Sequence, residues 1–216
     1  MITSDGSSTI HLPDWNENYH STHGAIQESK HVFISKGFDA VNLSEISILE
    51  IGFGTGLNCF ITFLEAQAKN KSINYVGVEA YPVTKEEALK LNYVTELNVA
   101  DQQSVFDAIH KYPWEEKQKI DSNFWLTKRK QFFKEITDKN QFDLIYFDAF
   151  GAEHQPELWT AVVFEKMYAA LKVGGILVTY AAKGSVRRAM QEVGFRVERL
   201  DGPPGKREML RAVKIK

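Results

Sequence analysis

The segment Leu49-Glu50-Ile51-Gly52-Phe53-Gly54-Thr55-Gly56-Leu57-Asn58 decides the fold of this chain. It joins a short apolar strand, Ser47–Ile51, to an amphipathic helix pattern, Leu57–Ala68, through three glycines at alternating positions. A strand, a glycine turn and a helix in this order form the first unit of a nucleotide-type binding fold. Glycines let the backbone approach a ligand where a Cβ would collide. We therefore expect a ligand site at this turn.

The glycine spacing discriminates between two classes of cofactor. A dinucleotide fingerprint needs its third glycine at position 57, where this chain has Leu57. The third glycine is instead Gly56, which gives Gly-x-Gly-x-Gly with the acidic Glu50 just before it. That variant is usual in S-adenosylmethionine (SAM) methyltransferases, and SAM has no pyrophosphate to place at the helix start. We predict that SAM is bound by Glu50, Gly52, Gly54, Gly56 and Asn58.

Length and composition restrict the class of protein. With 216 residues and 44% apolar content, the chain is expected to form one globular domain with a sizeable core. No apolar segment has the length of a membrane span, and residues 1–8 do not have the pattern of a signal peptide. The single Cys59 excludes an internal disulfide, and no zinc-ligand spacing occurs. We expect a cytoplasmic protein with no metal and no membrane partner.

The charge is unevenly distributed although the net charge is only −2. Residues 183–216 hold ten Lys or Arg and four Asp or Glu, so this part carries +6 and the remainder −8. A local excess of positive charge can bind phosphates whatever the total charge. It can equally be an ordinary solvated face.

Strand and helix patterns alternate after residue 46. Seven strands are expected, at Ser47–Ile51, Asn74–Glu79, Phe124–Lys128, Phe142–Phe147, Gly175–Tyr180, Phe195–Leu200 and Glu208–Ile215. Helices are expected between them, at Leu57–Ala68, Pro82–Leu91, Val99–Lys111, Lys130–Ile136, Pro156–Leu171 and Ser185–Val193. Alternating units favour a parallel sheet, and the last two strands form a hairpin. We predict an α/β fold of the class I SAM-dependent methyltransferase (Rossmann-like) type, with a seven-stranded, mostly parallel sheet.

Residues 1–46 are interpreted as an N-terminal extension, and residues 47–216 as the methyltransferase domain. Short strands are expected at Ser8–Leu12 and Tyr19–Ser21, around a turn at 13–16, and a helix at Gly24–Ile34. We expect this extension to pack over the cofactor side. The stretch Tyr112–Asp121 is expected to be an inserted loop because it contains Pro113-Trp114 and mixed charge.

Two acids end predicted strands. Glu79 lies 23 positions after Gly56, an offset at which an acid typically accepts hydrogen bonds from ribose hydroxyls. Asp148 ends the apolar strand 142–147 and precedes Ala149-Phe150. Because ligands gather at the carboxyl ends of strands in an open parallel sheet, we expect Asp148 to face the methyl-donor pocket. Phe150 either walls this pocket or fills the core, and the lone His154 fits a structural role better than a catalytic one.

Several segments together resemble a known family, the methyltransferase domain of the bifunctional bacterial enzyme that completes 5-methylaminomethyl-2-thiouridine at the tRNA wobble position. The matching segments span most of residues 24–213 and are Gly24–Ile34, Glu50–Asn58, Asp148-Ala149-Phe150, Pro156–Trp159, Thr179–Phe195 and Gly205-Lys206-Arg207-Glu208-Met209-Leu210. The resemblance implies methylation by SAM of the exocyclic amine of 5-aminomethyl-(2-thio)uridine in tRNA, with Asp148 beside that amine. A carboxylate raises the pKa of a neighbouring ammonium, so we assign Asp148 to positioning before strong general base.

The resemblance also implies tRNA as the partner. We predict phosphate contacts from Lys183, Arg187, Arg188, Lys206 and Arg207. The wobble base lies in a single-stranded loop, which suits extrusion onto aromatic walls. Candidates for that stacking are Trp15, Tyr19, Phe150 and Trp159.

Two departures from the family pattern affect these expectations. Bifunctional members carry a flavin-dependent oxidase domain, which residues 1–216 lack, so a separate enzyme is expected to supply the free aminomethyl group. The third predicted strand ends in Lys128-Arg129-Lys130, where many SAM enzymes have an acid near the adenine.

Three alternatives stay open on the sequence. The chain could methylate a small-molecule amine without RNA. It could be a nicotinamide-dependent oxidoreductase, against which Leu57 argues. It could be a non-catalytic module of the same fold, against which the presence of both Glu79 and Asp148 argues.

Overall fold

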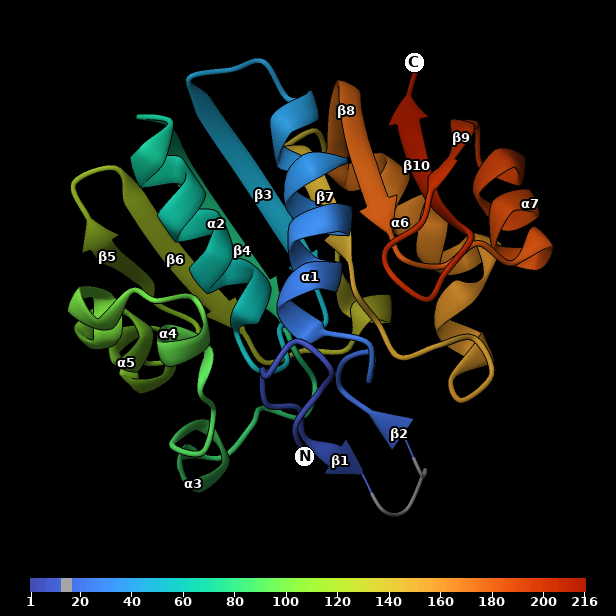
Figure 1. Ribbon diagram of the computed structural model, residues 1–216. Coiled ribbons are helices and arrows are strands. Elements are labelled where there is room, and N and C mark those ends of the chain that lie inside the picture. The colour runs from blue at the N-terminus through green and yellow to red at the C-terminus, as the bar shows by residue number, and fades with distance from the viewer. Residues whose placement is uncertain (13–16) are drawn as a thin grey trace.

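An eight-stranded sheet forms the centre of the computed structural model, which describes residues 1–12 and 17–216 (Figure 1). The strand order is β5-β6-β4-β3-β7-β8-β10-β9. The bounds are β3 (Glu45–Ile51), β4 (Ser72–Val78), β5 (Lys117–Asp121), β6 (Phe124–Arg129), β7 (Phe142–Phe147), β8 (Leu171–Thr179), β9 (Phe195–Asp201) and β10 (Glu208–Lys214). The expected turn at 13–16, with Trp15, lies outside the described residues.

The central strands are parallel and both edges of the sheet are antiparallel. β3 pairs in parallel with β4 and β7, while β6 and β8 extend this parallel core. β10 is antiparallel to β8 and β9, which confirms the predicted hairpin. The mostly parallel α/β sheet is as predicted, but it has eight strands and not seven.

The additional strand is β5, within the stretch that we expected to be a loop. It runs antiparallel to β6 at the edge of the sheet. Its Lys117 and Lys119 ammonium groups lie over the ring of Trp125, 5.7 and 5.9 Å from the centroid. A charged edge strand lacks the apolar alternation that identifies a buried strand, and such charge discourages pairing with other chains.

The helices are α1 (Ala25–Ser29), α2 (Leu57–Ala68), α3 (Lys85–Ala88), α4 (Tyr93–Glu96), α5 (Gln103–Lys111), α6 (Ala161–Ala170) and α7 (Gly184–Glu192), and a π-helical turn, Lys30–Ser35, continues α1. α3 is shorter than the predicted Pro82–Leu91 because Thr84 caps it, accepting a hydrogen bond from the Glu87 amide. Lys130–Ile136 holds only a 3-10 turn, Phe133–Glu135. Pro156 begins a separate 3-10 turn before α6. The strand β1 (His11–Leu12) is shorter than the predicted Ser8–Leu12, and β2 (Glu17–Asn18) precedes the predicted Tyr19–Ser21, which is not a strand.

Two apolar clusters fill the two faces of the sheet. α1, α2 and α5 pack on one face, and α6 and α7 on the other (Figure 1). Side chains of β3 alternate between them: Ile46 and Ile48 join the first cluster, and Leu49 and Ile51 the second. This period of two directs Glu50 toward α2 and leaves the loop after Ile51 at the carboxyl end of the strand. Within the described residues, no helix combines the length and apolarity that crossing a membrane requires.

Candidate active site

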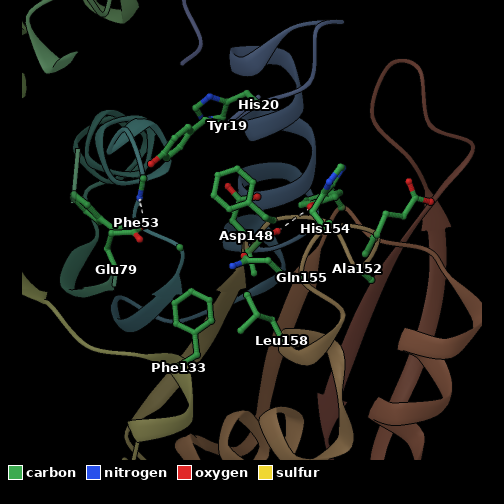
Figure 2. A pocket seen from close by; sticks show the side chains of 18 of the residues that line it. Tyr19, His20, Phe53, Glu79, Phe133, Asp148, Ala152, His154, Gln155 and Leu158 are labelled. Carbon is green, nitrogen blue, oxygen red and sulfur yellow. Dashed lines mark hydrogen bonds between the residues drawn. The ribbon is translucent and has the colours of Figure 1, made fainter. Parts of the chain in front are cut away.

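A cavity of about 1110 Å³ opens at the carboxyl ends of β3, β4, β7 and β8. Its lining combines the glycine loop, the residues after β4 and β7, and the N-terminal residues 18–22. Figure 2 shows Tyr19, Glu79 and Asp148 around this space, with Phe133 and Leu158 on the opposite wall. Ligands of open α/β sheets bind at this end, and the volume is sufficient for a nucleoside-sized molecule.

The three glycines of the loop have different surroundings. A Cβ on Gly52 would lie 2.5 Å from the backbone oxygen of Asp148, so this glycine allows the loop to touch the turn after β7. Gly54 has a φ of +47°, and a Cβ there would lie 3.0 Å from the ring of Tyr19. Both line the cavity. Gly56 starts α2 with its Cα facing Ile109 of α5, and does not line the cavity.

A fourth glycine, Gly77 in β4, shapes the loop although sequence reasoning missed it. A Cβ on Gly77 would lie 2.2 Å from the Phe53 ring, so only glycine leaves space for that ring. Phe53 also packs edge-on against Trp114, with 6.1 Å between ring centroids. An isolated glycine within an apolar strand is a signal for such close approach.

Glu79 lies directly after β4 and faces the cavity. Its carboxylate accepts hydrogen bonds from the amides of Gly54 and Tyr81, each at 3.0 Å. Burial raises the pKa of Glu79, and these amide donors act in the opposite direction. Glu79 therefore fixes the glycine loop and presents a carboxylate to the same cavity.

Asn58, in the first turn of α2, connects two of the predicted acids. Its Nδ2 donates to Glu50 Oε1 at 2.9 Å and to Asp148 Oδ2 at 2.8 Å. Its Oδ1 accepts a hydrogen bond from the Ser29 hydroxyl at 2.6 Å. Asn58 thus holds the Asp148 carboxyl group in one orientation.

Glu50 lies below the cavity and does not line it. Its side chain is fully buried, and it also accepts a hydrogen bond from the Tyr75 hydroxyl at 2.9 Å. Burial raises the pKa of Glu50 well above its ordinary value. The structure therefore places Glu50 behind Asn58, where it orients that amide.

Asp148 follows β7 and points into the cavity (Figure 2). Its amide donates to the carbonyl of Ile51, which fixes it beside the glycine loop. Burial raises the pKa of Asp148 to about 7, and the negative charge of Glu28 acts in the same direction. The hydrogen bond from Asn58 and the charge of Lys206 oppose this increase. A carboxyl group with this pKa can exchange a proton near neutral pH.

Glu28 and Lys206 form an ion pair at the cavity wall beside Asp148. The Lys206 ammonium lies 3.9 Å from the centroid of the Tyr180 ring, and the Tyr180 hydroxyl donates to Ala149 O at 2.8 Å. Of the five predicted basic contacts, Lys206 and Lys183 line the cavity, and Lys183 pairs with Glu153 at 2.7 Å. The remaining three lie outside it: Arg187 and Arg188 on α7, and Arg207 beside β10.

The aromatic side chains predicted to stack on the base also divide into those that line the cavity and those that lie behind it. Phe150 lines the cavity and meets the Tyr19 ring edge-on, with 5.1 Å between centroids. Trp159 is 5% exposed, its Nε1 donates to Phe150 O at 2.8 Å, and its ring packs on Phe147. Trp159 therefore supports the loop that carries Phe150 and does not line the cavity.

Lys128 lies near the end of β6, where many SAM enzymes have an acid near the adenine. Its buried ammonium donates to the carbonyl oxygens of Ile109 and His110, at 2.7 and 3.2 Å. It faces α5 and not the cavity, whose nearby wall includes Tyr81 and Phe133. In the described part of the chain, no group of three or more His, Cys, Asp or Glu side chains could hold a metal ion.

Residues 92–215 match the model of a family described as S-adenosyl-L-methionine-dependent methyltransferase. The chain belongs to this family. SAM, which the glycine spacing predicts, is the cofactor of the family, and the nicotinamide alternative is wrong.

The relatives of this methyltransferase include bifunctional proteins. It is 27% identical, over 92% of its length, to the "tRNA 5-methylaminomethyl-2-thiouridine biosynthesis bifunctional protein MnmC" of Marinomonas sp. (strain MWYL1). It is 30% identical, over 97% of its length, to the protein of the same name from Leptospira interrogans. The chain spans about a third of these relatives, 31% and 34% of their lengths, so the resemblance concerns their methyltransferase part.

Solved structures show the same fold. The crystal structure of MnmC2 from Aquifex aeolicus matches with a TM-score of 0.74 and 22% identity, over 99% of this chain and 69% of that one. Spermidine synthase from Thermotoga maritima matches with a TM-score of 0.57 and 15% identity, over 96% and 68% of the two chains.

Proposed function

We propose that this methyltransferase acts on the exocyclic amine of 5-aminomethyl-(2-thio)uridine at the tRNA wobble position and forms 5-methylaminomethyl-(2-thio)uridine. The observation that carries the proposal is Asp148: a carboxyl group held by Asn58 at the cavity wall, with a pKa of about 7. The names of the MnmC relatives identify the nucleoside. Localisation in the cytoplasm, where tRNA is modified, is part of the same proposal.

The residues around the cavity fit SAM. Gly52 and Gly54 bring backbone to its edge, where a Cβ would meet Asp148 or Tyr19. Glu79 offers carboxylate oxygens of the kind that accept hydrogen bonds from ribose hydroxyls. Glu50, Gly56 and Asn58 act on this site through the loop and through Asp148. When bound, SAM supplies a methyl group that is already activated by its sulfonium charge.

Asp148 orients the amine and accepts its proton. An alkyl ammonium has a pKa near that of lysine, about 10.4, so at neutral pH the substrate arrives mostly protonated. An ammonium has no lone pair with which to attack a methyl group. A carboxylate with a pKa of about 7 is a better proton acceptor than one with the ordinary value. Asn58 keeps Asp148 Oδ2 in place, so the second oxygen of the carboxylate is the one offered to the amine.

The tRNA is proposed to bind across the basic wall. Lys183 at the start of α7 and Lys206 lie at the cavity, and Arg187, Arg188 and Arg207 extend the positive charge beyond it. Phe150 and Tyr19 are the aromatic side chains against which the extruded base would stack, while Trp159 supports Phe150 from behind. A separate enzyme is proposed to supply the free aminomethyl group.

The proposal is tested by incubating the protein with methyl-labelled SAM and tRNA from cells that lack this activity, followed by nucleoside mass spectrometry. We expect 5-methylaminomethyl-(2-thio)uridine from the wild type, and a rate at least about 100-fold lower from Asp148→Asn with SAM affinity retained. Glu153→Gln is the matched control, because it removes an exposed acid of the same wall, which pairs with Lys183. Intact SAM binding without any transfer to tRNA would reject the tRNA substrate and favour a small-molecule amine.

A further inference from the structure

Lys206 directs its charge into the protein. It lies in the turn between β9 and β10, where the neighbouring Arg207 is exposed. Lysines on such turns normally extend their ammonium groups into water. Here the ammonium reaches the Tyr180 ring and the carboxylate of Glu28, whose side chain is 11% exposed. An aromatic face and a carboxylate together form a favourable site for a cation.

The Glu28–Lys206 pair joins α1 to the β9–β10 turn, but a second contact also joins this part of the chain to the hairpin. The π-helical turn after α1 already contacts the same hairpin through His31, whose Nε2 donates to Asp201 O at 2.8 Å. That contact lies away from the cavity, whereas Glu28, Lys206 and Tyr180 all line it together with Asp148. The opposite charges of Glu28 and Lys206 therefore lie at the same cavity as the Asp148 carboxyl group, which is proposed to accept the substrate proton.

We propose that Glu28 and Lys206 are positioning residues of the reaction site, acting on Asp148 in opposite directions and so setting the pH at which its carboxyl group takes up the substrate proton. The uptake of the substrate proton by Asp148 rests on the proposed function. The effect of the two charges on the ionisation of Asp148 does not. A nearby charge shifts the pKa of a buried carboxyl group more than the pKa of a carboxyl group on an exposed surface.

Two charged side chains at the cavity wall, Glu28 and Lys206, act on Asp148 in opposite directions. From α2 it receives only the neutral amide of Asn58. α1 contributes Glu28, and the β9–β10 turn contributes Lys206. Further titratable or charged groups also lie around the cavity or behind Asn58: Tyr19, His20, Glu50, Glu79, Tyr81, Lys134, Glu153, His154, Glu157, Tyr180 and Lys183.

The direction of each effect follows from charge alone. Removing the negative charge of Glu28 makes it easier for Asp148 to ionise, so its pKa falls. Removing the positive charge of Lys206 makes ionisation harder, so the pKa of Asp148 rises. If the pair had only a structural role, replacing Glu28 or Lys206 would loosen the same wall, and both variants would shift the pKa of Asp148 in the same direction.

The experiment is a titration of Asp148 by NMR, using protein labelled with ¹³C at the aspartate carboxyl groups and assigned with Asp148→Asn. We expect Glu28→Gln to lower the pKa of Asp148 and Lys206→Met to raise it, each by at least about 0.5 pH unit. Lys206→Arg keeps the charge and should restore the wild-type titration. Glu198→Gln is the control, since it breaks an ion pair with Arg211 in the same hairpin at 2.8 Å.

Opposite shifts in the two variants support the proposal. Shifts in one direction, or a titration in either variant within the range of the Glu198→Gln control, overturn it. The titration uses neither tRNA nor methyl transfer, so its result does not depend on the proposed substrate. Where transfer to tRNA is observed, the acidic limb of the rate profile should move with the titration, toward lower pH in Glu28→Gln and toward higher pH in Lys206→Met.

Discussion

At the scale of single residues, Gly54 provides the sharpest test of the cofactor loop. Its φ is +47° and a Cβ would press on the Tyr19 ring at 3.0 Å. We expect Gly54→Val to reduce SAM affinity at least about tenfold, in addition to losing about 1–2 kcal/mol of stability from the positive φ. Calorimetric titration with SAM measures the first effect and thermal unfolding the second.

Gly174 is the matched control for this prediction. It also has a positive φ, +82°, but no atom lies within 4 Å of a Cβ built there. Gly174→Val should lose stability and keep SAM affinity. Equal affinity losses in both variants would mean that the backbone penalty, and not the position in the loop, causes the effect.

The sequence pattern predicted the position of the residues at strand ends. Asp148 and Glu79 face the cavity because the carboxyl ends of parallel strands meet at one edge of the sheet, and strand ends are visible as a switch from apolar to acidic residues. Glu50, Gly56 and Trp159 lie behind the cavity surface. Their orientation depends on Tyr75, Ile109 and Phe147, partners distant in sequence that no local pattern specifies.

At the scale of elements, Lys128 links β6 to the end of α5. Its ammonium binds the last carbonyls of that helix, and burial lowers the pKa of Lys128 to about 8. Between this value and the ordinary value of about 10.4, the unfolded chain holds a proton that the folded chain has lost. The free energy of unfolding should therefore rise with pH over that interval. Lys128→Met should lack this rise.

Urea unfolding at pH 7.5 and pH 10 measures that difference. The comparison with Lys128→Met cancels the titration of the buried tyrosines, which both proteins share. If the free energy of unfolding changed equally with pH in the wild type and in Lys128→Met, the role of Lys128 would be contradicted. The sequence pattern alone could not indicate this role of Lys128, because a basic residue at a strand end is usually exposed to solvent. The charged strand β5 was missed for the same reason.

At the scale of the whole molecule, the reaction site costs stability. The pKa of Asp148 is raised to about 7 in the folded protein, above the ordinary value of 3.8. Between these values the folded state binds more protons than the unfolded state, so stability falls as pH rises from about 4 to 7. Asp148→Asn removes this dependence. It should be more stable than the wild type at pH 8, by at least about 1 kcal/mol, while the difference shrinks toward pH 4.

Thermal unfolding of both proteins across this pH range provides the measurement. A wild type that matches or exceeds Asp148→Asn at pH 8 would show that the carboxylate is well solvated in the folded protein. The sheet and its parallel order were predictable because alternation of strands and helices determines them, whereas this energetic cost depends on how α1 and the last hairpin enclose one side chain.

The enclosing wall also has a consequence for the order in which the protein folds. The Glu28–Lys206 pair in this wall joins residues 178 positions apart, and the His31–Asp201 contact, away from the cavity, joins the same two segments across 170 positions. Contacts of this separation form late, and α1 leaves the ribosome long before the β9–β10 turn has been synthesised. A nascent chain can thus assemble most of its sheet while the wall beside Asp148 is still missing. We therefore expect the wall beside Asp148 to be complete only once the β9–β10 hairpin has formed.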